Sequence, residues 1–228
     1  MLIHGAEDDI KRIRIHLDDL EREAPRAAAF EISPTGPIPG TKIRAPRGAA
    51  LALEEVAAAV PGTPVMRKDF LVDPVQILEA RSAGASGVLL IAAMLDDTAL
   101  RSMLDCATEH GLFVLLESFD EEDLARSSKL LDNPADRERA ESGQLLFGVN
   151  TRILRTLHVD PERMARLAPA LPAGRCVAES GLRTEADAAT VADLGYRLAL
   201  VGTALMRSED PAGLVAAMRD AGGARVAA

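Results

Sequence analysis

The chain reads Met66-Arg67-Lys68-Asp69-Phe70, then Asp73-Pro74, and then Gly87-Val88-Leu89-Leu90-Ile91. A short apolar run thus delivers Lys68 just before a helix whose expected N-cap is Asp73 and whose first residue is Pro74. Another apolar run of strand length follows. This order predicts one strand–helix–strand unit of a parallel sheet, with a lysine at the carboxyl end of a strand, where barrel enzymes hold catalytic groups.

The same alternation extends along most of the chain. The runs that we predict as strands are Ala27–Ile32, Pro64–Met66, Gly87–Ile91, Phe113–Glu117, Leu145–Val149, Arg175–Ala178 and Leu198–Val201. Helix starts are expected at Asp73-Pro74, Asp160-Pro161, Asp210-Pro211 and the capping box Thr184 to Asp187. Seven strands alternating with helices predict an α/β protein with a parallel sheet.

Composition limits the possible functions. With 228 residues, 48% of them hydrophobic and 27% charged, the chain fits a single globular domain, 1–228. The net charge of −9 opposes nucleic-acid binding, so a phosphorylated partner is expected to be a small molecule. The longest apolar run, Val88–Leu95, is far short of the ~20 residues that span a membrane. Cys106 and Cys176 are expected to be free thiols, which fits a cytoplasmic location.

Three regions depart from the alternation. Residues 33–51 contain four prolines and three glycines and predict a long loop or lid. The charged segment Arg126–Gly143 predicts a helix extension or a solvated surface excursion. Near the start, Ile10, Ile13, Leu17 and Leu20 recur at helical spacing and predict a helical extension over residues 7–24, across one end of the sheet.

Several predicted strands end in polar residues. They are Glu117, Asn150 with Arg152, Glu179-Ser180-Gly181 and Gly202-Thr203. In a parallel barrel the carboxyl ends of the strands meet at one face, so these residues are expected to share a site with Lys68.

The motifs around these residues resemble the indole-3-glycerol phosphate synthase family of tryptophan biosynthesis. The matching runs, in order, are Arg67-Lys68-Asp69-Phe70-Leu71, Leu116-Glu117, Gly148-Val149-Asn150-Thr151-Arg152, Ala178-Glu179-Ser180-Gly181-Leu182 and Val201-Gly202-Thr203-Ala204-Leu205. The resemblance covers about Leu53 to Met218. It implies a (βα)₈ TIM barrel and a carboxy-lyase that closes the ring of 1-(2-carboxyphenylamino)-1-deoxyribulose 5-phosphate with loss of carbon dioxide and water, without a cofactor or metal.

The resemblance also implies roles for single residues. Lys68 matches the general acid, Glu117 the general base, and Glu179 a second carboxylate near the ring. Glu31 matches a catalytic glutamate of the first strand. The remaining matches are Asn150, Arg152 and Ser180 for substrate binding, and Gly181, Gly202 and Thr203 for phosphate binding through backbone N–H groups.

The first strand departs from the family. It reads Phe30-Glu31-Ile32-Ser33-Pro34, so the lysine that the family has two positions after the glutamate is absent, and Lys42 or Arg44 is a candidate to replace it. The stretch from Glu31 to Lys68 is too short for a full set of elements, which predicts a βα unit missing or rebuilt near residues 33–52. A seven-stranded sheet would leave an open barrel or a gap covered by a homodimer.

These departures leave other functions open. One is a divergent paralogue acting on a related amino-sugar phosphate. Another is a non-catalytic, phosphate-binding partner subunit. A third is an isomerase or another lyase on a phosphorylated sugar, since one barrel fold hosts many reactions.

Overall fold

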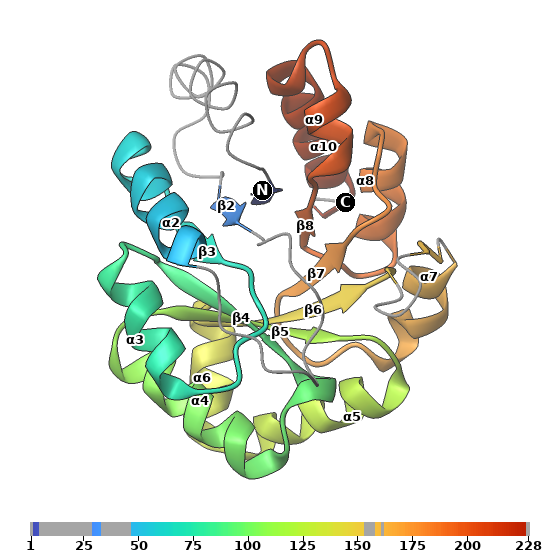
Figure 1. Cartoon of the computed structure of the whole chain (residues 1–228). Helices are drawn as coiled ribbons and strands as arrows, with labels where there is room; N and C mark the ends of the chain where they lie inside the picture. Colours follow the sequence, from blue (N-terminus) through green and yellow to red (C-terminus); the bar gives the residue numbers. More distant parts are fainter. Residues whose placement is uncertain (1, 5–28, 33–46, 153–157, 161, 227–228) are drawn as a thin grey trace.

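The computed structural model describes residues 2–4, 29–32, 47–152, 158–160 and 162–226, and it describes side chains from Leu53 onward. Eight parallel strands form a closed barrel in which each strand pairs with the next and β8 pairs with β1 (Figure 1). The strands are β1 (Leu2–His4), β2 (Ala29–Ile32), β3 (Val65–Arg67), β4 (Gly87–Ile91), β5 (Phe113–Ser118), β6 (Leu145–Asn150), β7 (Cys176–Glu179) and β8 (Leu198–Leu200). The predicted barrel fold is confirmed.

The expected strand count was wrong. The sequence predicted seven strands, with either an open barrel or a gap covered by a homodimer, whereas Leu2–His4 supplies another strand that pairs with Ala29–Glu31 on one side and with Leu200 on the other. Three residues that end in a histidine are too short for a periodic signal, because strands usually have about 5–6 residues. The closed sheet removes the gap that a homodimer was expected to cover.

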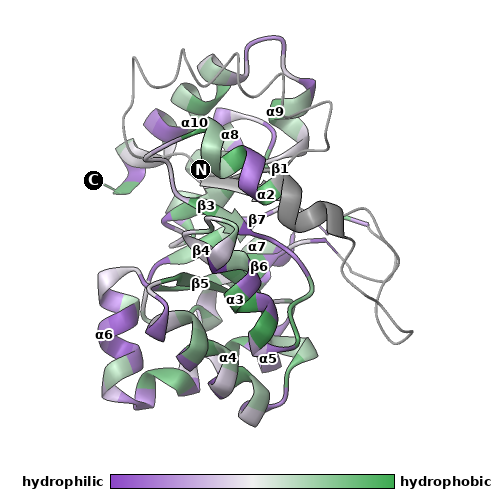
Figure 2. Ribbon diagram, turned by 60° about the vertical axis from the view of Figure 1, so that its left-hand side comes forward, coloured by the Kyte–Doolittle hydropathy of each residue, from purple (hydrophilic) through white to green (hydrophobic). Residues whose placement is uncertain are grey.

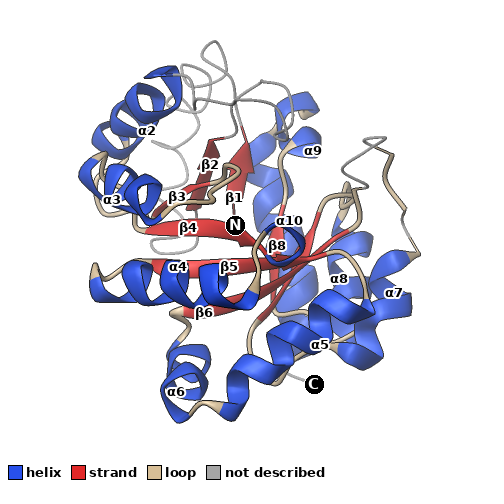
Figure 3. Cartoon of the chain, turned by 60° about the horizontal axis from the view of Figure 1, so that its bottom comes forward, coloured by secondary structure: helices blue, strands red, loops and turns tan. Residues whose placement is uncertain are grey.

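Helices surround the strands (Figure 3). They are α2 (Arg47–Ala59), α3 (Pro74–Ser82), α4 (Asp97–Glu109), α5 (Glu121–Lys129), α6 (Pro134–Ser142), α7 (Arg163–Leu167), α8 (Glu185–Asp193), α9 (Thr203–Arg207) and α10 (Pro211–Val226), with 3₁₀ turns at Ala92–Met94, Leu130–Asp132 and Ala168–Ala170. Arg47 to Leu51 lie in α2, so the predicted loop was wrong for these residues. The rest of that loop, which contains Lys42 and Arg44, lies outside the described residues. The predicted helical extension over residues 7–24 lies outside them as well. The region near residues 33–52, where a missing or rebuilt unit was expected, is described only from Arg47 onward.

Three of the four expected helix caps are confirmed. The Asp73 side chain accepts the N–H of Val75 at 2.8 Å, and Asp210 accepts that of Gly213 at 2.9 Å. Thr184 forms a complete capping box with Asp187. The prediction at Asp160 was wrong, because α7 begins only at Arg163 and has Glu162 as its N-cap.

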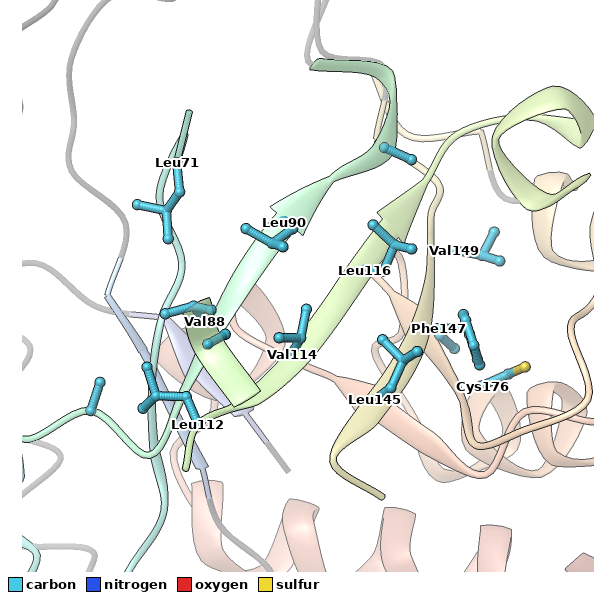
Figure 4. Packing of buried hydrophobic residues seen from close by; sticks show 14 of the residues in the cluster. Leu71, Val88, Leu90, Leu112, Val114, Leu116, Leu145, Phe147, Val149 and Cys176 are labelled. Atoms are coloured by element: carbon cyan, nitrogen blue, oxygen red, sulfur yellow. The ribbon is translucent and has the colours of Figure 1, made fainter. Parts of the chain in front are cut away.

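Side chains alternate between two hydrophobic layers. Val88, Leu90, Val114 and Leu116, together with Leu145, Phe147, Val149 and Cys176, pack between the strands and the helices (Figure 4). Their neighbours along the strands form a separate cluster inside the barrel, made of Met66, Leu89, Ile91, Leu115, Val177 and Leu200. Because side chains of a strand alternate, the inward residues that follow Met66, Leu115 and Val177 are Lys68, Glu117 and Glu179. The barrel therefore changes from apolar to charged toward its carboxyl end.

The charged segment Arg126–Gly143 forms the end of α5, a 3₁₀ turn and α6. The helix extension that the sequence predicted for this segment is therefore confirmed. Figure 2 shows α6 as one of the most hydrophilic elements. It is not simply solvated, however, because Asp136 is fully buried and accepts hydrogen bonds from Arg101 at 2.6 Å and Arg139 at 2.7 Å. This carboxylate links α6 to α4.

We expect Asp136→Ala to lower the free energy of unfolding by ~2–3 kcal/mol, because it removes two hydrogen bonds between charged groups that join α6 to α4. Urea denaturation measures the change. Asp105→Ala is the matched control: Asp105 is half-exposed and lies 3.5 Å from Arg101 and 3.6 Å from Arg139, so its loss should cost less than ~1 kcal/mol. Equal losses in the two variants would show that burial of Asp136 adds nothing.

Candidate active site

Three charged side chains meet inside the carboxyl end of the barrel. Lys68 directly follows β3, Glu117 lies in β5 and Glu179 ends β7. The Lys68 ammonium Nζ donates to Glu117 Oε2 at 2.7 Å and to Glu179 Oε2 at 3.5 Å. The two glutamate side chains are 1% and 0% exposed, whereas Lys68 is 17% exposed. The lysine thus joins two buried carboxylates and keeps part of its surface accessible.

The pKa of Glu117 is set by opposing effects. Burial on its own would raise the pKa of this carboxyl, because burial disfavours the charged form. The positive charge of Lys68 and hydrogen bonds from Lys68 and Asn150 act in the other direction, and together they hold the pKa of Glu117 below its ordinary value. A carboxylate that stays ionised in a dry pocket can take up a proton from a bound molecule.

Asn150 borders the two carboxylates at the end of β6 and is buried. Its side-chain oxygen accepts the backbone N–H of Arg152 at 2.8 Å, and Arg163 donates to its backbone carbonyl at 3.0 Å. Arg152 forms an isolated antiparallel bridge with Val159, and its side chain is partly buried. Asn150 is therefore bonded both to Arg152, two residues after it, and to Arg163 at the start of α7.

Arg67 and Lys68 are neighbours in sequence, but their side chains serve opposite faces of the sheet. Arg67 is buried outside the barrel, where it donates to the Gln76 carbonyl at 2.9 Å and to Asp69 at 3.1 Å. Asp69 in turn accepts the N–H of Phe70 at 2.8 Å. These bonds fix the turn that carries Lys68 between β3 and α3. Neither Arg67 nor Asp69 was predicted as a functional residue from the sequence. The alternation of side chains along the strand was the signal that places Arg67 on the face opposite Lys68.

The glycine-containing turns follow β7 and β8 as expected. Ser180 and Gly181 have left-handed backbones with φ of 67° and 84°, and Ser180 is the described non-glycine residue with such a conformation. For serine this conformation costs about 1–3 kcal/mol, a strain that clusters at functional sites. Gly202 is the N-cap of α9, and Thr203 is its first residue. Both turns thus lie at the face of the barrel that holds Lys68.

Glu31 is placed only by its backbone. It lies in β2 and pairs with His4 of β1 and with Met66 of β3. Its side chain is outside the part of the chain that the structure describes. The structure therefore brings together Lys68, Glu117, Asn150 and Glu179, and leaves the contacts of Glu31 unassigned.

Known proteins resemble this chain over most of its length. The family model for indole-3-glycerol phosphate synthase matches residues 41–218. The indole-3-glycerol phosphate synthase of Mycobacteroides abscessus is 43% identical over 171 residues, which are 75% of this chain and 58% of that protein. That of a Nocardioides species is 44% identical over 173 residues, covering 75% and 62%. The chain thus spans about three fifths of the length of the curated relatives it matches.

Solved structures show the same fold at low sequence identity. The 3-hexulose-6-phosphate synthase of Salmonella typhimurium has a TM-score of 0.69 at 16% identity, with 98% of both chains covered. A variant of the tryptophan synthase alpha-subunit of Pyrococcus furiosus has a TM-score of 0.61 at 15% identity, covering 97% of this chain and 96% of that one. None of the helices in the described ranges is long and apolar enough to cross a membrane. By the extent of its match to the family model and to the curated relatives, the chain belongs to the indole-3-glycerol phosphate synthase family.

Proposed function

We propose that the protein converts 1-(2-carboxyphenylamino)-1-deoxyribulose 5-phosphate to indole-3-glycerol phosphate, with loss of carbon dioxide and water. The observation that carries the proposal is the contact of Lys68 with two buried carboxylates at the carboxyl end of the barrel. Membership of the family supports the same reaction. A purely structural ion pair has no need to leave the lysine partly exposed at the face where barrel enzymes act.

The first step forms a carbon–carbon bond. The ring carbon that carries the carboxylate attacks the ketone carbon, and the electron pair of the carbonyl moves to its oxygen. Lys68 is the proton donor for this oxygen, since an ammonium group both stabilises the developing negative charge and protonates it. The carboxylate then leaves as carbon dioxide, and the electrons of the broken bond return to the ring.

The second step removes water. The new hydroxyl leaves as water after Lys68, reprotonated from solvent at its exposed face, donates a second proton, and this creates a transient cation that the nitrogen of the substrate shares. Glu117 takes the proton that must be lost to form the indole, and its lowered pKa keeps it ionised for this task. Glu179, held beside Lys68, supplies negative charge next to the cation. Glu31 is proposed as a further catalytic carboxylate on the resemblance of its strand alone.

The remaining site residues are proposed to hold the substrate. Asn150 lies against the carboxylates and offers an amide to the substrate, and Arg152 offers a fork suited to a carboxylate. Ser180 and Gly181 after β7, with Gly202 and Thr203 after β8, are proposed as the phosphate site. Left-handed backbone at Ser180 and Gly181 marks a tight turn after β7, and backbone N–H groups in turns bind phosphate.

A second candidate is a divergent paralogue that acts on a related amino-sugar phosphate. The observation that favours it is Ser33 at the position where the family has a lysine after the first-strand glutamate. A non-catalytic binding subunit is less well supported, because Lys68, Glu117 and Glu179 are in hydrogen-bonding positions. We further propose a single domain, because strands from both ends of the chain close one sheet, and a cytoplasmic location, which suits the free thiols of Cys106 and Cys176.

We expect the purified protein to produce the fluorescence of an indole when it is incubated with 1-(2-carboxyphenylamino)-1-deoxyribulose 5-phosphate. The measurement is the initial rate of fluorescence increase, with boiled protein as the control. A folded protein that binds this substrate without forming indole would reject the synthase reaction. Turnover of another arylamino-sugar phosphate would then identify the paralogue.

A further inference from the structure

Gly148 lies between the catalytic carboxylates. It is in β6, where its sheet partners are Glu117 of β5 and Val177 of β7. The alternation of β6 turns the position of its missing side chain toward the barrel interior, on the same face as Asn150 two residues later. A glycine thus occupies the part of the wall that faces the charged cluster.

The space beside Gly148 is filled by the Glu179 carboxylate. A Cβ atom added at Gly148 would overlap Glu179 Oε1, and it would lie 3.1 Å from both Glu179 Cδ and Leu115 Cδ1. Gly148 does not have the left-handed backbone that favours glycine, unlike Gly181. Its backbone conformation therefore permits any residue, and what requires glycine is the room that the carboxylate takes.

We propose that Gly148 is a positioning residue, whose lack of a side chain lets Glu179 rest against the strand and hold Lys68. The inference rests on the proposed function for its catalytic consequence, but the placement of Glu179 stands on geometry alone. With a methyl group at 148, Glu179 must rotate, because β6 is held by pairing on both sides and cannot retreat. The contact of 3.5 Å between Glu179 and Lys68 is then lost, and Glu117 becomes the remaining carboxylate of the pair at Lys68.

The test compares Gly148→Ala with Gly87→Ala. A Cβ at Gly87 also overlaps a side chain, the ring of Phe113, but at the amino end of the same barrel. Both variants therefore add a methyl group to a crowded strand, and only one of them displaces Glu179. We expect Gly148→Ala to lower kcat by ~100-fold with little change in KM, as a displacement of about 1 Å of a catalytic group does. Gly87→Ala should keep the wild-type kcat per folded molecule.

A rescue experiment separates positioning from general damage to the fold. Glu179→Asp shortens the side chain by one methylene and makes room for the methyl group at 148. The kcat of Gly148→Ala/Glu179→Asp should therefore exceed the kcat expected if the factors by which the two single changes lower kcat were simply multiplied. Independent effects of the two changes, or a wild-type kcat in Gly148→Ala, would overturn the proposal.

A crystal structure of Gly148→Ala keeps this inference distinct from the proposed reaction. A displaced Glu179 carboxylate in the variant supports the positioning role of Gly148. Absence of indole formation by the wild-type protein would reject the proposed reaction and leave this positioning role standing. A carboxylate that stays within hydrogen-bonding distance of Lys68 overturns the inference whatever the activity.

Discussion

Replacing Lys68 by methionine should lower kcat for indole formation by ~1000-fold, the middle of the range for loss of a general acid. Methionine keeps an unbranched chain and removes the ammonium group that lies 2.7 Å from Glu117. The rate is measured by the increase in indole fluorescence. Lys129→Met is the matched control, since Lys129 is exposed on α5 and should tolerate the change at full activity. A Lys68→Met rate within tenfold of wild type would remove Lys68 from the role of acid.

The same variant should also be less stable near neutral pH. Without Lys68 the buried Glu117 and Glu179 carboxylates lose the cation between them, so burial raises the pKa of Glu117 unopposed by that charge. We expect the loss of stability to shrink as the pH falls and a carboxylate takes up a proton. Activity must therefore be compared per folded molecule, with the folded fraction measured by circular dichroism.

Glu117→Gln should reduce kcat by ~100-fold or more, because the amide keeps the shape of the side chain and cannot accept a proton. Glu122→Gln, at an exposed position of α5, is the matched control and should be neutral. In the wild-type protein, the pKa of Glu117 is lowered, so the base stays ionised until the pH falls below the range in which an ordinary glutamate is protonated. The acid limb of kcat/KM against pH should therefore lie below this range. An acid limb above it would assign the base to another group.

Much of the fold could be predicted from residues that carry a local signal. The strand Gly87–Ile91 has the same bounds in the structure, and Asp73 caps α3 as its position before Pro74 indicated. β1 could not be recognised, because three residues carry no period and their pairing with β8 joins distant parts of the chain. α2 begins four residues before the end of the predicted loop, since Pro46 and Gly48 masked its start.

The residues that meet in the candidate site were easier to predict from the sequence than the residues that hold them in place. Strand ends indicated that Lys68, Glu117 and Glu179 share one face, and the structure places them in contact. The sequence did not indicate that Arg67 secures the turn from the outer face, because this depends on Gln76 in another element. Gly148 did carry a signal, since an isolated glycine inside a strand suggests a close approach, but the approaching group became known only from the structure.

The shortness of β3 has a consequence for how this sequence can change. Arg67 and Lys68 are adjacent cations on opposite faces: Arg67 bonds the turn after β3, and Lys68 contacts the two buried carboxylates. A slip of one residue in this strand would exchange them, turning a guanidinium toward the two carboxylates and an ammonium into the layer beneath the helices. Inserting or deleting one residue in β3 should therefore harm folding and the proposed catalysis together.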